Sequence, residues 1–219
     1  MKALILNSGL GKRMGDISNE QPKCMTKLND ENTILSRQLT LLDAMGIEEV
    51  IITTGKFDKA IRDYCCSLKL PLKISYIYNE RYSNTNYIYS IYCARDCLKD
   101  DDILLLHGDL VFEGIVLKKL MDTDQSAMAV SSTSPLPQKD FKAVIQNGLI
   151  RKIGIDYFED AYAAQPFYKL LQKDWELWSD KIAEYCENGQ CDCYAENAFN
   201  DISLLCKITP LDIKECLCN

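Results

Sequence analysis

The feature that most limits how this chain can fold is a short apolar run that leads directly into a glycine-containing loop. Residues 3–6 read Ala-Leu-Ile-Leu, which is typical of a strand buried on both faces of a sheet. Residues 7–14 then read Asn-Ser-Gly-Leu-Gly-Lys-Arg-Met, and Pro22-Lys23 follows shortly after. Glycines let backbone N–H groups approach an anion closely, and lysine and arginine supply counter-charge. The pattern predicts a loop that binds a triphosphate at the end of the first strand.

Two better-known phosphate-binding loops do not fit this segment. A P-loop needs Ser or Thr directly after its Gly-Lys pair, where this chain has Arg13, and its glycines lie further apart than Gly9 and Gly11. The dinucleotide-binding fingerprint needs a small residue at position 14, which is Met14 here. An ordinary glycine turn is the alternative, but the cations Lys12 and Arg13 next to it favour phosphate binding.

Apolar runs and helical periodicities alternate along the rest of the chain. Strands are predicted at 2–7, 50–52, 74–78, 103–106 and 127–132, and helices at 33–45, 59–64, 116–121 and 171–185. This alternation predicts an α/β protein with a doubly wound, mostly parallel sheet and right-handed crossovers. Asn147-Gly148 between the apolar runs 141–145 and 149–153 favours a hairpin, so we expect an antiparallel hairpin extension. The aromatic segment 162–168 is expected to line a lid over a pocket.

The fourth predicted strand ends in a sequence that suits a metal ion. Ligands of doubly wound sheets bind beyond the carboxyl ends of the strands, and this strand runs into His107-Gly108-Asp109. Mg²⁺ prefers one or two carboxylates together with phosphate oxygens and water. Asp109 is therefore the candidate ligand of a triphosphate-bound Mg²⁺, and a plain turn residue is the alternative.

Length and composition favour a single domain and argue against nucleic-acid and membrane partners. The 219 residues suit one domain, 1–219, and their formal net charge of −7 argues against a nucleic-acid partner. No apolar run approaches the roughly 20 residues of a membrane span, and no secretory signal precedes the first strand. We therefore expect a cytoplasmic protein with no membrane partner. The 11 cysteines read as reduced thiols, and the absence of a Cys-x-x-Cys pair around Cys186, Cys191 and Cys193 favours packed thiols over a zinc site.

The glycine loop resembles that of a known enzyme family. Gly9-x-Gly11-x-Arg13-Met14 followed by Pro22-Lys23 is similar to the start of the pyrophosphorylase-type nucleotidyltransferases, which have a Rossmann-like fold. The resemblance implies that a nucleoside triphosphate is joined to a phosphorylated small molecule with release of pyrophosphate. It implies catalytic roles for Arg13, which holds the leaving pyrophosphate, and for Lys23, which contacts phosphate oxygens at the reacting end. The implied nucleotide contacts in this region are Leu6, Asn7, Gly9, Gly11 and Lys12.

A second segment points to cytidine. Residues 82–90, Tyr-Ser-Asn-Thr-Asn-Tyr-Ile-Tyr-Ser, resemble a segment of the cytidylyltransferases that act on phosphocholine or aminoethylphosphonate. That resemblance implies CTP contacts from Thr85, Asn86 and Ser90, with His107 as a further contact where relatives often have an aspartate. The alternative for Thr85 and Asn86 is a helix cap beside an exposed loop.

A third segment concerns the acceptor of the nucleotidyl group. In the same relatives a Tyr-x-Asp/Glu-Asn segment lies at the acceptor pocket, which implies substrate contacts from Tyr194, Glu196 and Asn197. An aromatic ring beside a carboxylate suits a small cation, because the ring face attracts an ammonium and the carboxylate neutralises it. The alternative is an ordinary helix start with acidic residues favoured by the helix dipole.

The expected activity is transfer of CMP from CTP to 2-aminoethylphosphonate, with Mg²⁺ as cofactor and pyrophosphate as product. Phosphocholine is the second candidate acceptor and a sugar 1-phosphate the third, while a non-catalytic nucleotide-binding domain is the alternative of another class. Relatives carry a second Mg²⁺-binding carboxylate in a Glu-Ile-Asp segment, and neither Asp212 nor Glu215 stands in that pattern. We therefore expect residues 1–219 to be the N-terminal part of a longer chain, in which a second enzyme domain can be fused.

Overall fold

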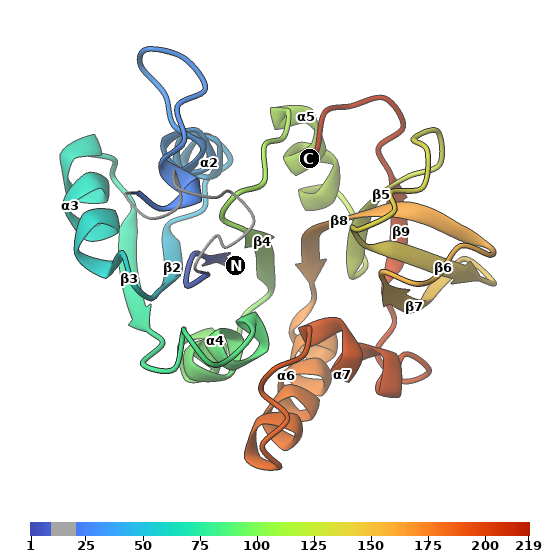
Figure 1. The fold of residues 1–219 in the computed structure, drawn as a ribbon. Helices are drawn as coiled ribbons and strands as arrows, with labels where there is room; N and C mark the ends of the chain where they lie inside the picture. Colours follow the sequence, from blue (N-terminus) through green and yellow to red (C-terminus); the bar gives the residue numbers. More distant parts are fainter. Residues whose placement is uncertain (10–20) are drawn as a thin grey trace.

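The protein is built around one large mixed sheet (Figure 1). The computed structural model describes residues 1–9 and 21–219 of the chain. Within these residues the sheet has nine strands, in the order β3-β2-β1-β4-β8-β5-β9, with β6 paired to β7 and β8. The strands are β1 (Lys2–Leu6), β2 (Glu49–Thr54), β3 (Lys73–Tyr78), β4 (Ile103–His107), β5 (Ala127–Ser131), β6 (Lys142–Gln146), β7 (Leu149–Gly154), β8 (Ala161–Leu170) and β9 (Thr209–Asp212).

The strand directions confirm the predicted fold class. β1 runs parallel to β2 and β4, β2 is parallel to β3, and β5 is parallel to β9. β6 and β7 form the predicted antiparallel hairpin around Asn147 and Gly148, whose positive φ angles of 53° and 73° suit an Asn-Gly turn. The sheet is therefore mostly parallel with an antiparallel extension.

One expectation about the second half of the chain was wrong. The segment expected to line a pocket lid is the central strand β8, which lies antiparallel between β4 and β5. Its residues Phe167 and Tyr168 are fully buried in the core. Only Gln165 and Pro166, together with the neighbouring alanines 163 and 164, reach a cavity from this strand.

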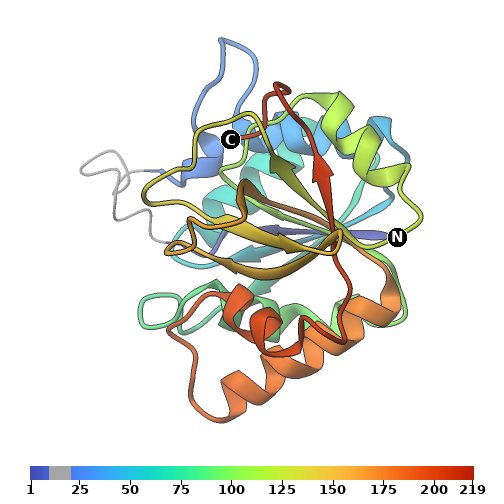
Figure 2. The same cartoon turned by 90° about the vertical axis from the view of Figure 1, so that its right-hand side faces the viewer.

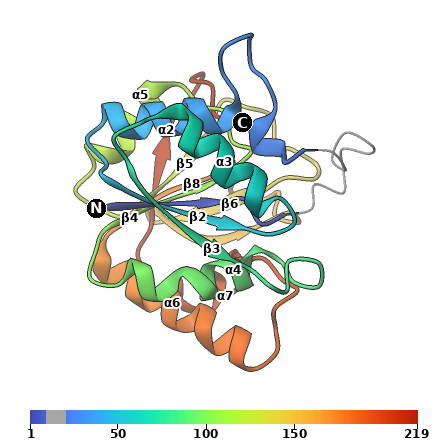
Figure 3. The same cartoon turned by 90° about the vertical axis from the view of Figure 1, so that its left-hand side faces the viewer.

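Helices cover both faces of the sheet (Figures 2 and 3). Buried strand residues alternate between the two sides, so that Ala3 and Ile5 pack into one apolar cluster and Leu4 and Leu6 into the other. The first cluster is covered by α2 (Ile34–Ala44), α3 (Asp58–Leu68) and α5 (Gly114–Met121), and the second by α4 (Tyr87–Ala94), α6 (Gln172–Glu187) and α7 (Ala195–Ile202). Two short 3₁₀ helices, η2 (Lys23–Met25) and η3 (Arg95–Leu98), complete the described elements.

Local signals explain where two site-proximal helices begin. Thr33 caps α2 through a capping box with Ser36, since each side chain accepts a hydrogen bond from the other residue's backbone N–H. Asn86 caps α4 by accepting a hydrogen bond from the Tyr87 N–H at 2.8 Å. These caps set where the two helices begin, and the helices pack against opposite faces of the sheet.

The last described residues return to the carboxyl end of β4. Val111 and Asn219 exchange backbone hydrogen bonds of 2.7 and 2.8 Å, and the Glu113 N–H donates to the Leu217 carbonyl at 2.9 Å. This places residues 217–219 along the segment that follows β4 (Figure 1). Among residues 1–9 and 21–219, no helix combines the length and apolar character needed to cross a membrane.

Candidate active site

A cavity of about 1270 Å³ opens at the carboxyl ends of the central parallel strands. This is the edge at which doubly wound sheets bind ligands, and the volume exceeds the roughly 300–1,000 Å³ of a typical small-molecule pocket. The cavity is bordered by segments from distant parts of the sequence, namely 8–9, 82–87, 107–110, 133–141, 163–166, 192–194 and 214–219. It therefore has room for a nucleotide and a second small molecule.

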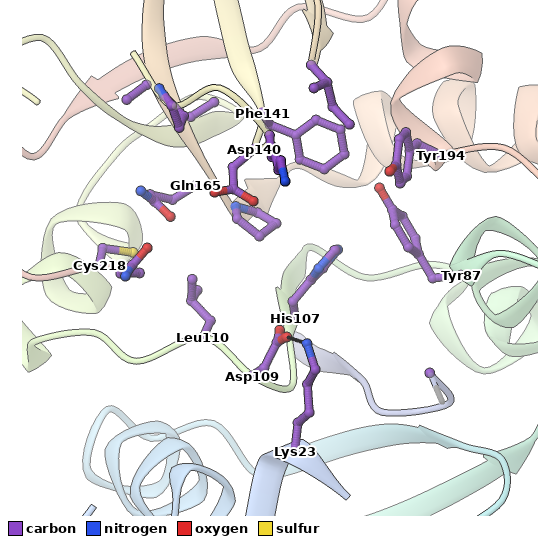
Figure 4. Close-up of a pocket in the computed structure, with 18 of the residues that line it drawn as sticks. Lys23, Tyr87, His107, Asp109, Leu110, Asp140, Phe141, Gln165, Tyr194 and Cys218 are labelled. Carbon is purple, nitrogen blue, oxygen red and sulfur yellow. Dashed lines mark hydrogen bonds and ion pairs between the residues drawn. The ribbon is translucent and has the colours of Figure 1, made fainter. Parts of the chain in front are cut away.

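Lys23 and Asp109 meet at one side of this cavity. The Lys23 Nζ lies 3.2 Å from the Asp109 Oδ2, and the two side chains are 32% and 46% exposed (Figure 4). Lys23 is presented by the start of η2 and Asp109 by the turn after β4. The two residues that the sequence analysis singled out for phosphate and metal binding thus lie side by side.

The turn that carries Asp109 is packed tightly against the end of β1. A Cβ atom on Gly108 would lie 1.7 Å from the Asn7 Oδ1, so only glycine fits here while the Asn7 side chain keeps its place. The Gly108 N–H donates to the Leu6 carbonyl at 3.0 Å. Leu6 and Asn7 support this turn, and their expected contacts with CTP stay predictions: Leu6 is 8% exposed within the core, and the Nδ2 of Asn7 is buried with no partner among the described residues.

Aromatic side chains gather at another side of the cavity. The Tyr87 ring lies 5.9 Å from Tyr194 and 4.7 Å from the His107 ring, while Phe141 meets Tyr194 edge-on at 5.0 Å. Figure 4 shows Tyr87, Tyr194 and Phe141 around one end of the open space, with Lys23 and Asp109 at another. We call Tyr87, His107, Phe141 and Tyr194 the aromatic corner. Burial lowers the pKa of His107 below its usual value despite the nearby carboxylates, so its ring is neutral at pH 7.

A buried carboxylate stands directly behind the aromatic corner. Glu196 is 1% exposed, and its two oxygens accept hydrogen bonds from the hydroxyls of Tyr87 and Tyr168, the latter at 2.7 Å. Burial and the nearby Glu196 raise the pKa of both tyrosines well above the usual value, so both remain hydrogen-bond donors. Glu196 is therefore not among the described residues that border the cavity, whereas its partner Tyr87 is, and the expected contact of Glu196 with an acceptor stays a prediction.

Asn197, which was also expected to contact the acceptor, does not border the described cavity. Asn197 is exposed on α7, where its backbone carbonyl accepts a 3.5 Å hydrogen bond from the Tyr185 hydroxyl. It is not among the described residues that border the cavity, whereas Tyr194 is. Glu196 and Asn197 therefore face different directions, because neighbouring helical positions face different sides.

A buried polar network joins the glycine loop to α4. The Ser8 and Ser90 hydroxyl oxygens are 2.5 Å apart, and the Asn79 side-chain amide donates to Ser90 at 2.9 Å and to Thr85 at 3.3 Å. Ser90 is fully buried and is not among the described residues that border the cavity, so its expected CTP contact stays a prediction. Ser8 and Thr85 border the cavity, and Asn79 couples the positions of both.

The remaining expected nucleotide contacts divide into two groups. Gly9, Thr85, Asn86 and His107 border the cavity, where their expected contacts with CTP stay predictions. Gly11, Lys12 and Arg13 lie outside the described residues, so their expected contacts with the triphosphate stay predictions. The described start of the glycine loop nevertheless leads into the same cavity as Lys23 and Asp109.

Sequence reasoning missed several residues of the cavity wall. Asp140 and Phe141 come from the segment after β5, whose prolines at 135 and 137 marked only a loop. Asp192 precedes Tyr194 by two positions and borders the cavity with it. Tyr87 lay inside the segment that resembled cytidylyltransferases, and its aromatic neighbours 82 and 89 were the available signal.

The residues at the cavity suit a divalent cation that arrives with its phosphates. Among the described residues, no three His, Cys, Asp or Glu side chains gather into a site that could enclose a metal by themselves. Asp109 offers one half-exposed carboxylate, and Glu215 borders the same cavity. Mg²⁺ commonly uses one or two carboxylates and takes its other ligands from phosphate and water. The donor set therefore fits Mg²⁺ better than a metal held in an all-protein cage.

Comparison with known proteins finds relatives whose names refer to cytidine nucleotides. The CMP-5′-(3-aminopropyl)phosphonate synthase of Streptomyces rubellomurinus is 36% identical over 136 residues, covering 62% of this chain and 21% of that protein. The choline-phosphate cytidylyltransferase of Haemophilus influenzae is 35% identical over 104 residues, covering 46% of this chain and 41% of that protein. The chain thus spans about a fifth and about two fifths of the lengths of these two relatives.

A solved structure shares the fold of this chain, and a sequence family matches most of its length. The solved CTP:phosphocholine cytidylyltransferase of Streptococcus pneumoniae superimposes with a TM-score of 0.76 at 17% identity, covering 99% of this chain and 91% of that chain, which shows a shared fold. The sequence family described as the MobA-like NTP transferase domain matches residues 3–170, from β1 to the end of β8. These residues include Lys23, the Asp109 turn and most of the cavity wall. The chain therefore belongs to the MobA-like NTP transferase domain family of nucleotidyltransferases.

Proposed function

We propose that the protein is a cytidylyltransferase that transfers CMP from CTP to 2-aminoethylphosphonate and releases pyrophosphate. The observation that carries this proposal is the chemical division of one cavity. One side offers the Lys23–Asp109 pair, which suits phosphate and metal, and another offers the aromatic corner, which suits a small cation. A zwitterionic acceptor with an anionic and a cationic end matches this division. The named cytidylyltransferase relatives support cytidine as the nucleoside.

Lys23 and Asp109 are proposed to bind the phosphate groups of CTP and the metal ion that accompanies them. Asp109 would hold the Mg²⁺ that accompanies CTP, and this ion, when bound, neutralises charge on the phosphate oxygens. Lys23 already pairs with Asp109, so its ammonium stands where it can also bind a phosphate oxygen. Arg13 and the amides of the glycine loop are proposed to hold the pyrophosphate that leaves.

The aromatic corner is proposed to bind the cationic end of the acceptor. The faces of Tyr87, Tyr194 and Phe141 attract an ammonium group, because an aromatic ring carries partial negative charge on its faces. Asp140 and Asp192 border the cavity one and two positions before Phe141 and Tyr194, and their carboxylates can accept hydrogen bonds from a primary amine. This supports 2-aminoethylphosphonate as the first candidate acceptor.

The proposed reaction is a single in-line displacement. A phosphonate oxygen of the acceptor attacks the α-phosphorus of CTP, a new P–O bond forms, and the bond between the α-phosphorus and the bridging oxygen breaks with that electron pair leaving on pyrophosphate. The acceptor oxygen is already anionic, so the protein needs no general base and no covalent intermediate. The task of Lys23 is to offset the repulsion between two anions, and the task of the aromatic corner is to orient the acceptor.

Phosphocholine is the second candidate acceptor. Its quaternary ammonium cannot donate a hydrogen bond and is recognised through aromatic faces, of which the corner provides three from Tyr87, Phe141 and Tyr194. The three rings favour this candidate, whereas the two bordering carboxylates favour the primary amine. A sugar 1-phosphate has neither kind of cation and is the third candidate.

A pyrophosphate-release assay tests the proposal. The protein is incubated with CTP and Mg²⁺ and, separately, 2-aminoethylphosphonate, phosphocholine, glucose 1-phosphate or no acceptor, and products are identified by phosphorus NMR. The expected result is release with 2-aminoethylphosphonate, a phosphonic–phosphoric anhydride product and loss of release after chelation of Mg²⁺. Faster release with phosphocholine would move the assignment to the second candidate. Absence of release with every acceptor and every nucleoside triphosphate would overturn the proposal in favour of a nucleotide-binding domain.

A further inference from the structure

A buried glutamine on α2 holds both ends of the turn that carries Asp109. Gln38 is 1% exposed, and its Nε2 donates hydrogen bonds to the carbonyl oxygens of His107 at 3.0 Å and Leu110 at 2.8 Å. The Leu110 N–H donates to the same His107 oxygen at 3.2 Å, which closes the turn 107–110. One side-chain amide group therefore bridges the first and last residues of the turn, with Asp109 between them.

The amide of Gln38 is oriented so that its NH₂ group bonds to the turn, which leaves its Oε1 without a donor among the described residues. Its two carbonyl partners can be met only by the NH₂ group, so the orientation of the amide is fixed. The Oε1 of Gln38 is buried, and none of the described residues donates a hydrogen bond to it. A buried acceptor without a donor is unfavourable, and an apolar side chain of the same size would avoid it. The hydrogen bonds to the turn therefore explain a glutamine at position 38 better than packing in the core does.

Other contacts hold the same turn from both sides. The Arg37 Nη2, one position before Gln38, donates to the Phe112 carbonyl at 3.1 Å. On the opposite side the Asn7 side chain occupies the space where Gly108 would carry a Cβ atom. The backbone of the turn is therefore fixed, while the Asp109 side chain remains 46% exposed to the cavity.

We propose that Gln38 is a positioning residue that sets the Asp109 carboxylate for the metal–triphosphate complex. Gln38 acts through the turn and does not itself border the described cavity. The inference rests on the proposed function, because that function gives Asp109 its metal. Groups that orient a metal ligand commonly change metal affinity by roughly 10–100-fold when they are removed.

The test compares Gln38→Met with Leu42→Ala. Methionine keeps the size of glutamine without the donor, and Leu42 is fully buried on the same helix, so its truncation loosens α2 from the core by another route. Three quantities are measured in both variants: hydrogen exchange at the Leu110 amide, binding of Mn²⁺·CTP by the EPR signal of free Mn²⁺, and the Mg²⁺ concentration for half-maximal turnover. For Gln38→Met we expect exchange at Leu110 to rise at least about tenfold and the metal requirement roughly 10–100-fold, with the acceptor KM within about twofold.

The outcomes separate this inference from the proposed function. Unchanged exchange at Leu110 in Gln38→Met, or an equal rise in Leu42→Ala, overturns the inference whether or not the protein turns CTP over. Faster exchange with an unchanged metal requirement also overturns it, since Gln38 is then structural only. If the unmodified protein releases no pyrophosphate, the proposed function fails, and Mn²⁺·CTP binding together with exchange at Leu110 decides the positioning role.

Discussion

Under the proposed function, the contact between Lys23 and Asp109 is expected to matter more for chemistry than for stability. Both side chains are partly exposed, and exposed ion pairs contribute only about 0–1 kcal/mol to folding. A cation that stabilises charge at the reacting phosphorus is worth more, typically about 10²–10³ in turnover. We predict that Lys23→Ala slows pyrophosphate release by that factor and changes the free energy of unfolding by less than about 1 kcal/mol. Steady-state kinetics and urea denaturation check the two parts.

Lys59→Ala is the matched control for this prediction. Lys59 also pairs with an aspartate, Asp63, but on the outer face of α3, where both side chains are largely exposed. We expect both turnover and stability to stay close to those of the unmodified protein. Equal turnover in Lys23→Ala and Lys59→Ala would show that Lys23 has no part in the reaction.

Gly108 is required by a neighbour rather than by its own backbone angles. A methyl group at this position would lie 1.7 Å from the Asn7 Oδ1, so either the Asn7 side chain or the turn must move. We predict that Gly108→Ala destabilises the protein by about 1–3 kcal/mol, and that adding Asn7→Ala recovers most of the loss. A urea-denaturation double-mutant cycle measures the coupling. Additive effects of the two substitutions would contradict the contact.

At the scale of elements, α7 supports the aromatic corner through a single carboxylate. Glu196 on α7 accepts hydrogen bonds from Tyr87 on α4 and Tyr168 on β8, which joins three elements behind the cavity. Neither tyrosine partner carries positive charge, so the carboxylate lends negative potential to the corner. We predict that Glu196→Gln raises the KM of a cationic acceptor by roughly tenfold and leaves the KM of CTP unchanged.

Asn197→Ala provides the comparison on the same helix. Asn197 is exposed and lies outside the described cavity wall, so we expect neither KM to change. An increase in the acceptor KM in Asn197→Ala equal to that in Glu196→Gln would restore the direct contact suggested by the sequence. An unchanged KM in both variants would place the cation elsewhere in the cavity.

The elements that the sequence predicted are those with strong local signals. The runs of β1, β2, β3 and β4 are apolar, and the caps of α2 and α4 follow familiar residue preferences. β8 was missed because it contains Gln165 and Pro166, which read as a loop. The pairing with β4 ends at Phe167, and the ladder with β5 is irregular between Met128 and Val130, so the proline is tolerated there.

Residues of the candidate site, like the helices and strands, could be predicted where the local sequence signal is strong. Lys23 and Asp109 stood in short motifs whose spacing carries chemical meaning, so sequence reasoning could select them. Phe141 and Asp192 were not singled out, and tertiary contacts bring them to the cavity: the Phe141 carbonyl accepts from the Ala164 N–H at 3.0 Å, and the Cys191 carbonyl beside Asp192 accepts from the Asn86 N–H at 2.8 Å. Glu196 was selected for its residue type, but burial by tertiary contacts decides whether a carboxylate meets a ligand or another side chain.

For the whole molecule, buried thiols predict a loss of stability at alkaline pH. Burial raises the pKa of Cys186, Cys206 and Cys218 to about 12, whereas thiols of an unfolded chain ionise near roughly 8.5. Above that pH the unfolded state releases protons that the folded state keeps, so rising pH favours unfolding. Each of these thiols lowers the free energy of unfolding by about 1.4 kcal/mol per pH unit in this range.

Urea denaturation under reducing conditions between pH 7.5 and 10 measures this loss. Cys206→Ala removes one buried thiol, so we expect the slope of stability against pH to become shallower, by little at pH 7.5 and by an amount that approaches about 1.4 kcal/mol per pH unit near pH 10. The truncation also lowers stability at neutral pH, but that effect is constant with pH and does not enter the slope. An unaltered slope would show that Cys206 does not keep its proton in the folded protein.

The place of β8 in the sheet has a consequence during synthesis on the ribosome. β4 lies between β1 and β8, so its second edge stays unpaired until residues 161–170 have been made. This edge belongs to a strand whose residues 103–106 are entirely apolar, and unpaired apolar edges promote aggregation. We therefore expect a nascent chain that has reached only β5 to be prone to aggregation, and fragments cut between β5 and β8 to be insoluble.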